Sequence, residues 1–207
     1  MSKNLIICFE GIEGSGKSFH LKNVALYLKK KRIPFIKLRE PGGSKNSEKI
    51  RKLILNNKST FRKKTDLLLY LAARNENIEN VITKNYKKKI ILIDRFLDST
   101  IAYQHYGMNL DKKIIQIINS YLLKKIKISF TFLLTVSEKN LKLRLSKRKK
   151  LNRYDKFANS FYKRVQTGFI NQSKMNKKKY LIIDSNNKVS DNKNLITEKI
   201  NQLLNIS

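Results

Sequence analysis

Residues 4–31, NLIICFEGIEGSGKSFHLKNVALYLKKK, place an apolar run, a glycine-rich loop and a helical pattern one after another. The loop Gly11-Ile12-Glu13-Gly14-Ser15-Gly16-Lys17-Ser18 fits the pattern G-x-x-x-x-G-K-[ST]. Bare backbone N–H groups can wrap a phosphate there, because glycine accepts unusual dihedral angles. The helix after the loop points its positive amino terminus at the same oxygens. The position between a strand and a helix favours a phosphate-binding loop over a glycine turn with an incidental lysine.

This loop predicts ATP binding and assigns roles to two side chains. Lys17 is expected to reach the β- and γ-phosphates, and the Ser18 hydroxyl is expected to bind Mg²⁺. The cofactor-binding residues predicted from the motif are Gly11, Ile12, Glu13, Gly14, Ser15, Gly16, Lys17 and Ser18. Because such loops occur in ATPases, GTPases and many kinases, the second substrate has to be identified from other segments.

Apolar β-branched runs alternate with longer helical patterns along the chain. We expect strands at about residues 4–10, 33–39, 89–94, 129–136 and 180–184. Helices are expected at about residues 17–31, 44–57, 65–86, 99–106, 111–123, 137–147, 154–174 and 191–204. This alternation predicts an α/β fold with a five-stranded parallel sheet and helices on both faces. We expect residues 1–207 to form one domain, with the active site at the carboxyl ends of the strands.

The chain is strongly basic, with 46 Lys and Arg against 15 Asp and Glu and a net charge of +31. Such a charge is typical of proteins that bind nucleic acid. However, the runs Lys29–Arg32, Lys87–Lys89 and Lys177–Lys179 each end a predicted helix just before a strand, away from the predicted site. No aromatic-plus-basic stacking motif accompanies them. We therefore interpret the charge as compositional drift and expect no specific nucleic-acid partner.

Two features bear on the compartment. Cys8 is the single cysteine and falls in a predicted buried strand, so no internal disulfide can form. This indicates a reducing cytoplasm. The first apolar run, Leu5–Phe9, is too short for a signal peptide or a membrane span, so no membrane association is expected.

Three further segments fall where an acceptor would lie: Arg39-Glu40-Pro41-Gly42-Gly43, Tyr70-Leu71-Ala72-Ala73-Arg74, and residues 94–104, DRFLDSTIAYQ. Together with the phosphate-binding loop, they resemble the thymidylate kinase family over nearly the whole chain. The resemblance implies a P-loop NTPase fold with a lid, and transfer of a phosphoryl group from ATP to dTMP with Mg²⁺ in dTTP biosynthesis. It also implies a homodimer.

The resemblance implies that Arg95 binds the phosphate of dTMP. The guanidinium of arginine can form a bidentate contact with phosphate, which lysine cannot. A structural salt bridge is the alternative reading of Arg95. Asp94 is expected to join the Mg²⁺ shell through water or to orient the phosphates. The resemblance implies substrate binding by Glu13, Arg39, Glu40, Pro41, Tyr70, Arg74, Arg95, Ser99, Thr100, Tyr103 and Gln104.

Within that set, the resemblance has Tyr70 stack on thymine and Arg74 bond its carbonyl oxygen, with Thr100 and Gln104 as further base contacts. In the alternative reading, Tyr70 belongs to the core and Arg74 is exposed. Tyr103 corresponds to the residue that crowds the sugar 2′ position, and Glu13 is expected to face the acceptor.

The basic connection Lys147-Arg148-Lys149-Lys150-Leu151-Asn152-Arg153 joins two predicted helices. It corresponds to the lid of the family, which we expect at about residues 147–154. The catalytic residues that follow are Lys17, Asp94 and Arg95, with Arg148 and Arg153 as lid arginines that stabilise transition-state charge. A solvated basic loop is the alternative, and which arginine acts is left open.

Two other functions compete with dTMP phosphorylation. A deoxynucleoside kinase needs a carboxylate base near the sugar, usually with an Asp/Glu-Arg-Ser arrangement after the third strand, where this chain has Phe96 after Arg95. A basic P-loop ATPase that binds nucleic acid would leave the acceptor segments without a purpose. A degenerate nucleotide binder is disfavoured by the intact Lys17, Asp94 and Arg95.

Overall fold

A five-stranded parallel sheet forms the centre of the computed structural model, which describes residues 5–206. Its strands are β1 (Ile6–Glu10), β2 (Phe35–Arg39), β3 (Ile90–Asp94), β4 (Phe130–Thr135) and β5 (Tyr180–Asp184), in the order β2-β3-β1-β4-β5. All of the pairings are parallel, so the predicted fold class is confirmed. Asn4, which was expected in the first strand, lies outside the described residues.

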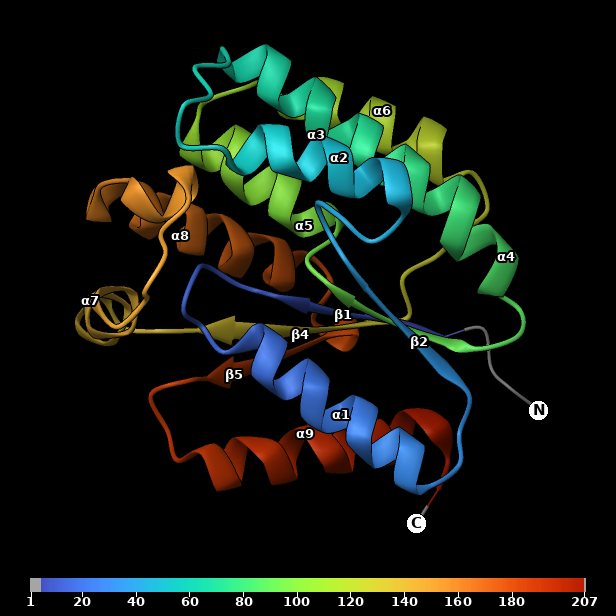
Figure 1. The fold of residues 1–207 in the computed structure, drawn as a ribbon. Coiled ribbons are helices and arrows are strands. Elements are labelled where there is room, and N and C mark those ends of the chain that lie inside the picture. Colours follow the sequence, from blue (N-terminus) through green and yellow to red (C-terminus); the bar gives the residue numbers. More distant parts are fainter. Residues whose placement is uncertain (1–4, 207) are drawn as a thin grey trace.

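The three central strands are apolar on both sides because helices cover both faces of the sheet (Figure 1). Continuous Ile, Leu and Phe runs are typical of parallel strands that are buried on both faces. Along β1, Ile7 and Phe9 face one core cluster, and Ile6 and Cys8 face another. In the register, Phe9 lies beside Asp94 and Phe132, which brings the carboxyl ends of β1, β3 and β4 together.

Helices α1 (Lys17–Lys30) and α9 (Val189–Leu204) pack against each other on the lower face of the sheet in Figure 1. The other helices are α2 (Lys45–Leu55), α3 (Lys63–Asn77), α4 (Thr83–Asn85), α5 (Leu97–Thr100), α6 (Lys112–Leu123), α7 (Glu138–Ser146) and α8 (Asn159–Met175). Of these, α2, α3, α5, α6 and α8 lie above the sheet (Figure 1). None of the helices within residues 5–206 is both long and apolar enough to cross a bilayer.

Two of the predicted helices carry local π-helical turns. The expected helix over residues 65–86 is α3 followed by a π-helical segment, Ile78–Ile82, and the short α4. The helix expected at residues 99–106 begins earlier, with α5, and continues as the π-helical segment Ile101–Gly107. Such turns have wider spacing than an α-helix and occur frequently at functional sites.

The helix predicted over residues 154–174 begins later than expected, at Asn159. Before it, Arg153–Lys156 form a 3₁₀ turn that Asn152 caps. The Asn152 side chain accepts from the Tyr154 N–H at 2.8 Å, and the Asp155 carboxylate accepts from the Asn152 N–H at 3.0 Å. This reciprocal capping box closes the turn, so the chain extends through Phe157 and Ala158 before α8 begins.

Candidate active site

A cavity opens at the carboxyl ends of β1, β2 and β3, as expected for a parallel sheet. It is lined by Glu13, Lys17, Ser18, Arg39, Glu40, Pro41, Arg51, Leu55, Tyr70, Arg74, Asp94, Arg95, Phe96, Ser99, Thr100, Tyr103, Gln104, Arg148, Asn152 and Tyr154. All eleven residues predicted to bind the acceptor are in this set. Segments that are far apart in the sequence, from Glu13 to Tyr154, therefore form one site.

The glycine-rich loop adopts the backbone conformation that its sequence predicts. Gly11 has a φ of 138°, and Gly16, at the amino end of α1, has a φ of 89°. A Cβ atom on Gly11 would lie 2.1 Å from the Leu134 carbonyl oxygen, which is backbone and cannot move aside cheaply. A side chain is therefore excluded from Gly11 by sterics as well as by its dihedral angle.

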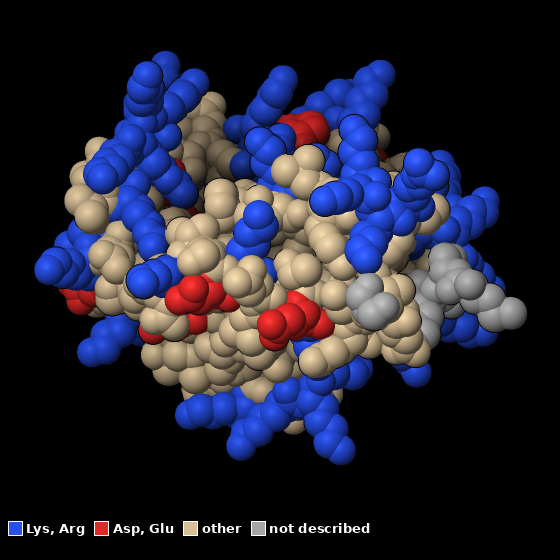
Figure 2. All heavy atoms as spheres, turned by 90° about the horizontal axis from the view of Figure 1, so that it is seen from below, with Lys and Arg blue, Asp and Glu red and all other residues tan. Residues whose placement is uncertain are grey.

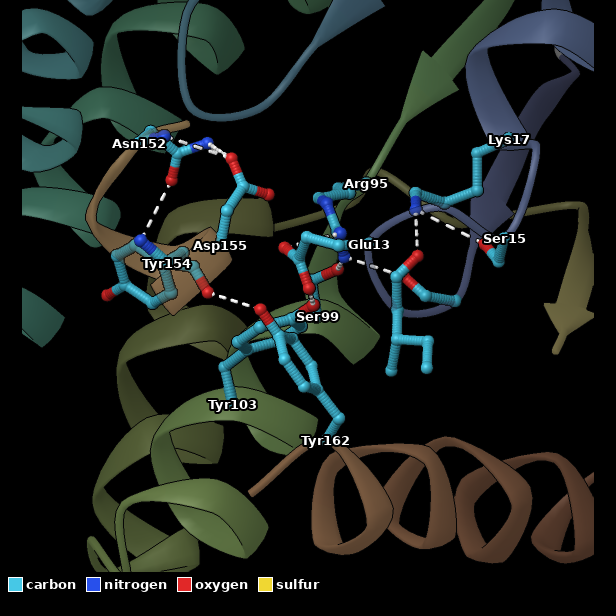
Figure 3. A network of polar contacts seen from close by, with 12 residues as sticks. Glu13, Ser15, Lys17, Arg95, Ser99, Tyr103, Asn152, Tyr154, Asp155 and Tyr162 are labelled. Atoms are coloured by element: carbon cyan, nitrogen blue, oxygen red, sulfur yellow. Dashed lines mark hydrogen bonds and ion pairs between the residues drawn. The ribbon is translucent and has the colours of Figure 1, made fainter. Parts of the chain in front are cut away.

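Lys17 is buried beside this loop (Figure 3). Its ammonium donates to the Ile12 carbonyl oxygen at 2.6 Å and to the Ser15 hydroxyl at 3.4 Å, and it makes no ion pair with any described residue. Burial lowers the pKa of Lys17 to about 7, and the nearby charge of Arg95 adds to the effect. A buried cation that lacks a counter-ion fits an anionic ligand such as the phosphates of ATP.

Ser18 and Asp94 come together where α1 begins and β3 ends. The Ser18 hydroxyl donates a hydrogen bond to the Asp94 carboxylate. Adjacent hydroxyl and carboxylate oxygens are the hard ligands that Mg²⁺ prefers. Within residues 5–206 no three His, Cys, Asp or Glu side chains are grouped to hold a metal, so Ser18 and Asp94 offer two oxygen donors and not a closed metal site.

Arg95 follows β3 with a φ of 67°, a left-handed conformation that costs a non-glycine residue about 1 kcal/mol or more. Its Nη1 donates to the Gly11 carbonyl oxygen at 2.7 Å and to the Ser99 hydroxyl at 3.3 Å. Its Nη2 donates to Oε1 of Glu13 at 2.9 Å. A guanidinium has five N–H donors, so two of them, including Nε–H, remain for a ligand. Arg95 thus forms a structural salt bridge, with Glu13, and still has N–H donors without a partner among the described residues.

Tyr103 completes this cluster. Its hydroxyl donates to the second carboxylate oxygen of Glu13, and its ring lies under the Arg95 guanidinium at 5.0 Å (Figure 3). Glu13, inside a phosphate-binding loop, is therefore held by a cation and a hydroxyl, which limits its repulsion of phosphate. Glu13 lines the cavity, and its expected contact with the acceptor stays a prediction.

Arg74 is almost fully buried, contrary to the alternative that left it exposed. Its Nε donates to Glu40 at 2.8 Å and its Nη1 to the Asn119 side-chain oxygen at 2.7 Å. Its Nη2 donates to the Phe96 carbonyl oxygen at 2.9 Å and to the Thr100 hydroxyl at 2.8 Å. Four of its five N–H donors are used inside the protein, so one N–H remains.

Of the other predicted base contacts, Tyr70 packs against a neighbouring ring, whereas Gln104 has an unsatisfied polar group. Tyr70 is half-buried, and its ring packs edge-on against Tyr154 at 5.9 Å between centroids. Gln104 is buried, and its side-chain nitrogen has no hydrogen-bond partner among the described residues. A buried donor without an acceptor is costly, so Gln104 is suited to a ligand that presents an acceptor.

The structure separates the two candidate lid arginines. Arg148 lines the cavity and is ion-paired with Asp155. Arg153 is not among the lining residues, and its Nη2 donates to both carboxylate oxygens of Asp66 on α3, at 2.6 and 2.8 Å. The expectation that Arg153 lies in the site therefore does not hold in this conformation, because a buried carboxylate binds it.

Arg39 and Arg51 both line the cavity, and each already has a partner within the protein. Arg39 is ion-paired with Glu48 at 3.0 Å near the surface. Arg51 donates to the Pro41 carbonyl oxygen at 2.5 Å.

Several site residues were not predicted from sequence. Arg144 on α7 donates to the carbonyl oxygens of Gly14 at 2.8 Å and Ser185 at 2.6 Å. The Ser185 hydroxyl in turn donates to the Ser15 carbonyl oxygen at 2.6 Å. These bonds give the Gly14 and Ser15 carbonyl oxygens hydrogen-bond partners, although Arg144 is 130 residues from Gly14 in the chain. Tyr154 and Asn152 reach the cavity through the capped turn, which no sequence pattern had separated from α8.

Known proteins resemble this chain over nearly all of its length. The family model described as thymidylate kinase matches residues 9–196. A thymidylate kinase from Acholeplasma laidlawii is 37% identical over 95% of this chain and 98% of its own length. One from Mycoplasma capricolum is 35% identical over 96% and 97%. The crystal structure of thymidylate kinase from Ehrlichia chaffeensis superposes with a TM-score of 0.77 at 28% identity, covering 95% of this chain and 97% of that one. This chain belongs to the thymidylate kinase family.

Proposed function

We propose that this protein transfers the γ-phosphoryl group of ATP to dTMP, giving dTDP and ADP, with Mg²⁺ as the cofactor. The observation that carries the proposal is the position of Arg95. It lies against the glycine-rich loop, through the Gly11 carbonyl oxygen, and keeps two N–H donors for an acceptor phosphate. The donor and acceptor phosphates can then meet at one point of the cavity.

On the donor side, the loop N–H groups and Lys17 hold the β- and γ-phosphates of ATP. Ser18 and Asp94 would hold Mg²⁺, which shields the charge of the phosphates when it is bound. Arg144 and Ser185 brace this loop by donating to the carbonyl oxygens of Gly14 and Ser15. These positions support catalytic roles for Lys17 and Asp94.

On the acceptor side, Arg95 orients the phosphate of dTMP toward the γ-phosphorus. An oxygen of that phosphate attacks the γ-phosphorus, the new P–O bond forms, and the bond to the β–γ bridging oxygen breaks as ADP leaves. Because the acceptor phosphate is already ionised, the reaction needs no strong general base. The chain's contribution is positioning and neutralisation of charge.

Base and sugar are recognised at the other end of the cavity. Gln104 donates to a carbonyl oxygen of thymine, which satisfies its orphaned nitrogen. Tyr70 provides an aromatic surface for the base, and Arg74 fixes Thr100 and offers its remaining N–H. Tyr103, held by Glu13, crowds the 2′ position and favours deoxyribose.

The segment of residues 147–154 acts as the lid, and Arg148 is its catalytic arginine. Arg148 already lines the cavity, and its ion pair with Asp155 would have to open for it to contact the transferring phosphoryl group. Arg153 anchors the lid to α3 through Asp66. A deoxynucleoside kinase would instead need a carboxylate base free at the sugar, and Glu13 is taken by Arg95 and Tyr103.

The distribution of charge supports a small-molecule substrate over a nucleic-acid partner. On the face that Figure 2 shows, Lys and Arg side chains project in all directions around the periphery, with Asp and Glu between them. A nucleic-acid surface concentrates its cations along one face or groove. The scattered charge is instead consistent with a solvated, lysine-rich surface.

The protein forms a homodimer through α3 and α6, which lie side by side in Figure 1. Large apolar side chains are exposed on these two helices: Leu68 on α3, and Ile114, Ile117 and Tyr121 on α6. Ile117 is 68% exposed and Tyr121 is 75% exposed. Apolar side chains that gather on neighbouring helices are typical of a protein–protein interface.

A coupled assay of ADP release with Mg-ATP tests the proposed function, with dTMP, dUMP, TMP, dCMP and thymidine as acceptors. dTMP should be the best acceptor, and thymidine should give no turnover. Turnover of thymidine would favour the deoxynucleoside kinase, and ADP release that depends on added DNA or RNA would favour the nucleic-acid ATPase.

A further inference from the structure

Glu10, the last residue of β1, is buried beneath the acceptor site and makes no ion pair with any described residue. Its Oε1 accepts from the Phe96 N–H at 2.7 Å and from the Ser99 N–H at 3.3 Å. Its Oε2 accepts from the Ser99 hydroxyl at 2.6 Å. All three partners are donors, and they belong to the turn that immediately follows Arg95.

These bonds constrain both the backbone and the guanidinium of Arg95. At the backbone, Arg95 has its left-handed φ of 67°, and the next N–H is held by Glu10. At the guanidinium, Nη1 donates to the Ser99 hydroxyl, the same hydroxyl that donates to Glu10. A backbone conformation that is unfavourable for arginine persists only where its surroundings determine it, and Glu10 supplies three of those contacts.

We infer that Glu10 is a positioning residue for phosphoryl transfer: it holds the turn at residues 96–99 and thereby aims the Arg95 guanidinium at the acceptor phosphate. The inference rests on the proposed function, because it needs Arg95 to bind that phosphate. Glu10 does not touch the substrate, since it is not among the residues that line the cavity.

A carboxylate suits this position because it is an acceptor at both oxygens. Glutamine has nearly the same shape but presents an N–H in place of one oxygen. The Ser99 hydroxyl would then lose its acceptor and would have to rotate, although it also accepts from Arg95. Glu10→Gln therefore tests the hydrogen-bond polarity with little change in volume.

Calorimetry of dTMP and thymidine binding tests whether Glu10 orients the Arg95 guanidinium or only supports the fold. Thymidine carries the same base and sugar but no phosphate. Glu10→Gln should weaken dTMP binding roughly 10-fold, the effect of losing one hydrogen bond to a charged group, and leave thymidine binding unchanged. Glu40→Gln is the matched control: it alters the other buried glutamate of the site, which holds Arg74, and should weaken both ligands equally.

A second variant guards against misfolding. Ser99→Ala keeps the Glu10 contact with the Phe96 N–H but removes the link to Arg95, so it should also weaken dTMP selectively. If Glu10→Gln weakens the binding of dTMP and of thymidine equally, the inference is overturned but the proposed function is not. The same outcome with Ser99→Ala decides the question if Glu10→Gln does not fold. A wild-type protein that binds thymidine as tightly as dTMP would overturn the proposed function and the inference with it.

Discussion

Nη2 of Arg95 lies 2.9 Å from Oε1 of Glu13, so an arginine after β3 is ion-paired to a carboxylate of the phosphate-binding loop. The two residues are 82 positions apart in the chain. The pair ties the acceptor side of the cavity to the donor side. Both side chains are mostly buried, so breaking the pair leaves a charge with little solvent to compensate it.

Arg95→Lys should lower kcat/KM for dTMP roughly 100-fold, because lysine keeps the charge but cannot form a two-pronged contact with phosphate. The KM for ATP should change much less, since Lys17 and the loop N–H groups remain. Steady-state kinetics with each substrate varied in turn would measure both. Equal losses for the two substrates would show that Arg95 supports the fold of the loop and does not grip the acceptor.

Arg148→Ala and Arg153→Ala form a matched pair from the same segment. Arg148→Ala should reduce kcat about 100-fold or more, as expected when an arginine that stabilises the transferring phosphoryl group is removed. Arg153→Ala should mainly lower the melting temperature, because it leaves the buried Asp66 without its cation. Rapid-quench measurements of the transfer step, with melting curves alongside, separate the two effects. A larger kcat loss from Arg153→Ala would reverse the assignment.

The pKa of Lys17, which burial lowers to about 7, predicts how ATP affinity and stability change with pH. An unfolded lysine has a pKa of about 10.4, so between pH 7 and 10 the unfolded chain binds more protons at this site than the folded one. The Lys17 contribution therefore makes the ligand-free protein more stable as the pH rises through this window. Phosphate favours the ammonium form, so ATP binding should weaken over the same window.

Calorimetry of ATP binding at pH 8, in two buffers with different ionisation enthalpies, would measure the linked proton. Binding should take up a substantial fraction of one proton. Lys22→Met, which alters an exposed lysine on the same helix, should leave this uptake unchanged. If the wild-type protein takes up no proton, the Lys17 ammonium is already fully charged without ATP.

The exposed apolar face of α6 predicts the oligomeric state. The wild-type protein should sediment at twice the chain mass of 24.3 kDa, and a variant with Ile117→Lys and Tyr121→Lys should sediment at 24.3 kDa. Charges placed inside an apolar interface are costly to bury. Leu195→Lys, on α9 across the sheet, should leave the dimer intact. A wild-type protein that is already monomeric at micromolar concentration would contradict the proposed dimer.

Much of the fold was predictable because its determinants are local in sequence. The loop from Gly11 to Ser18 needs glycine at positions where other residues would clash or be strained. The loop can therefore be recognised from the spacing of its glycines in the sequence. Ser44 caps α2 by accepting from the Ser47 N–H, which places the helix start near where the apolar spacing predicted it. The acceptor set also lies together as expected, since the carboxyl ends of parallel strands share one edge.

The remaining features depend on partners that are distant in sequence. Arg148 and Arg153 look equivalent in a basic run, and only the buried carboxylate of Asp66, 87 residues from Arg153, separates them. Arg74 matches an expected base ligand, yet most of its donors are used by Glu40, Asn119, Phe96 and Thr100. The structural role of Arg144 at the loop carbonyls likewise has no counterpart in local spacing.

A crystal structure with dTMP and a non-hydrolysable ATP analogue bound together tests the central claim most directly. The account predicts the γ-phosphate in the glycine loop and the dTMP phosphate within about 3 Å of the free Arg95 N–H groups. An acceptor oxygen should lie roughly 3–3.5 Å from the γ-phosphorus, in line with the bond that breaks. An Arg95 that contacts only Glu13, Gly11 and Ser99, with the dTMP phosphate held elsewhere, would contradict it.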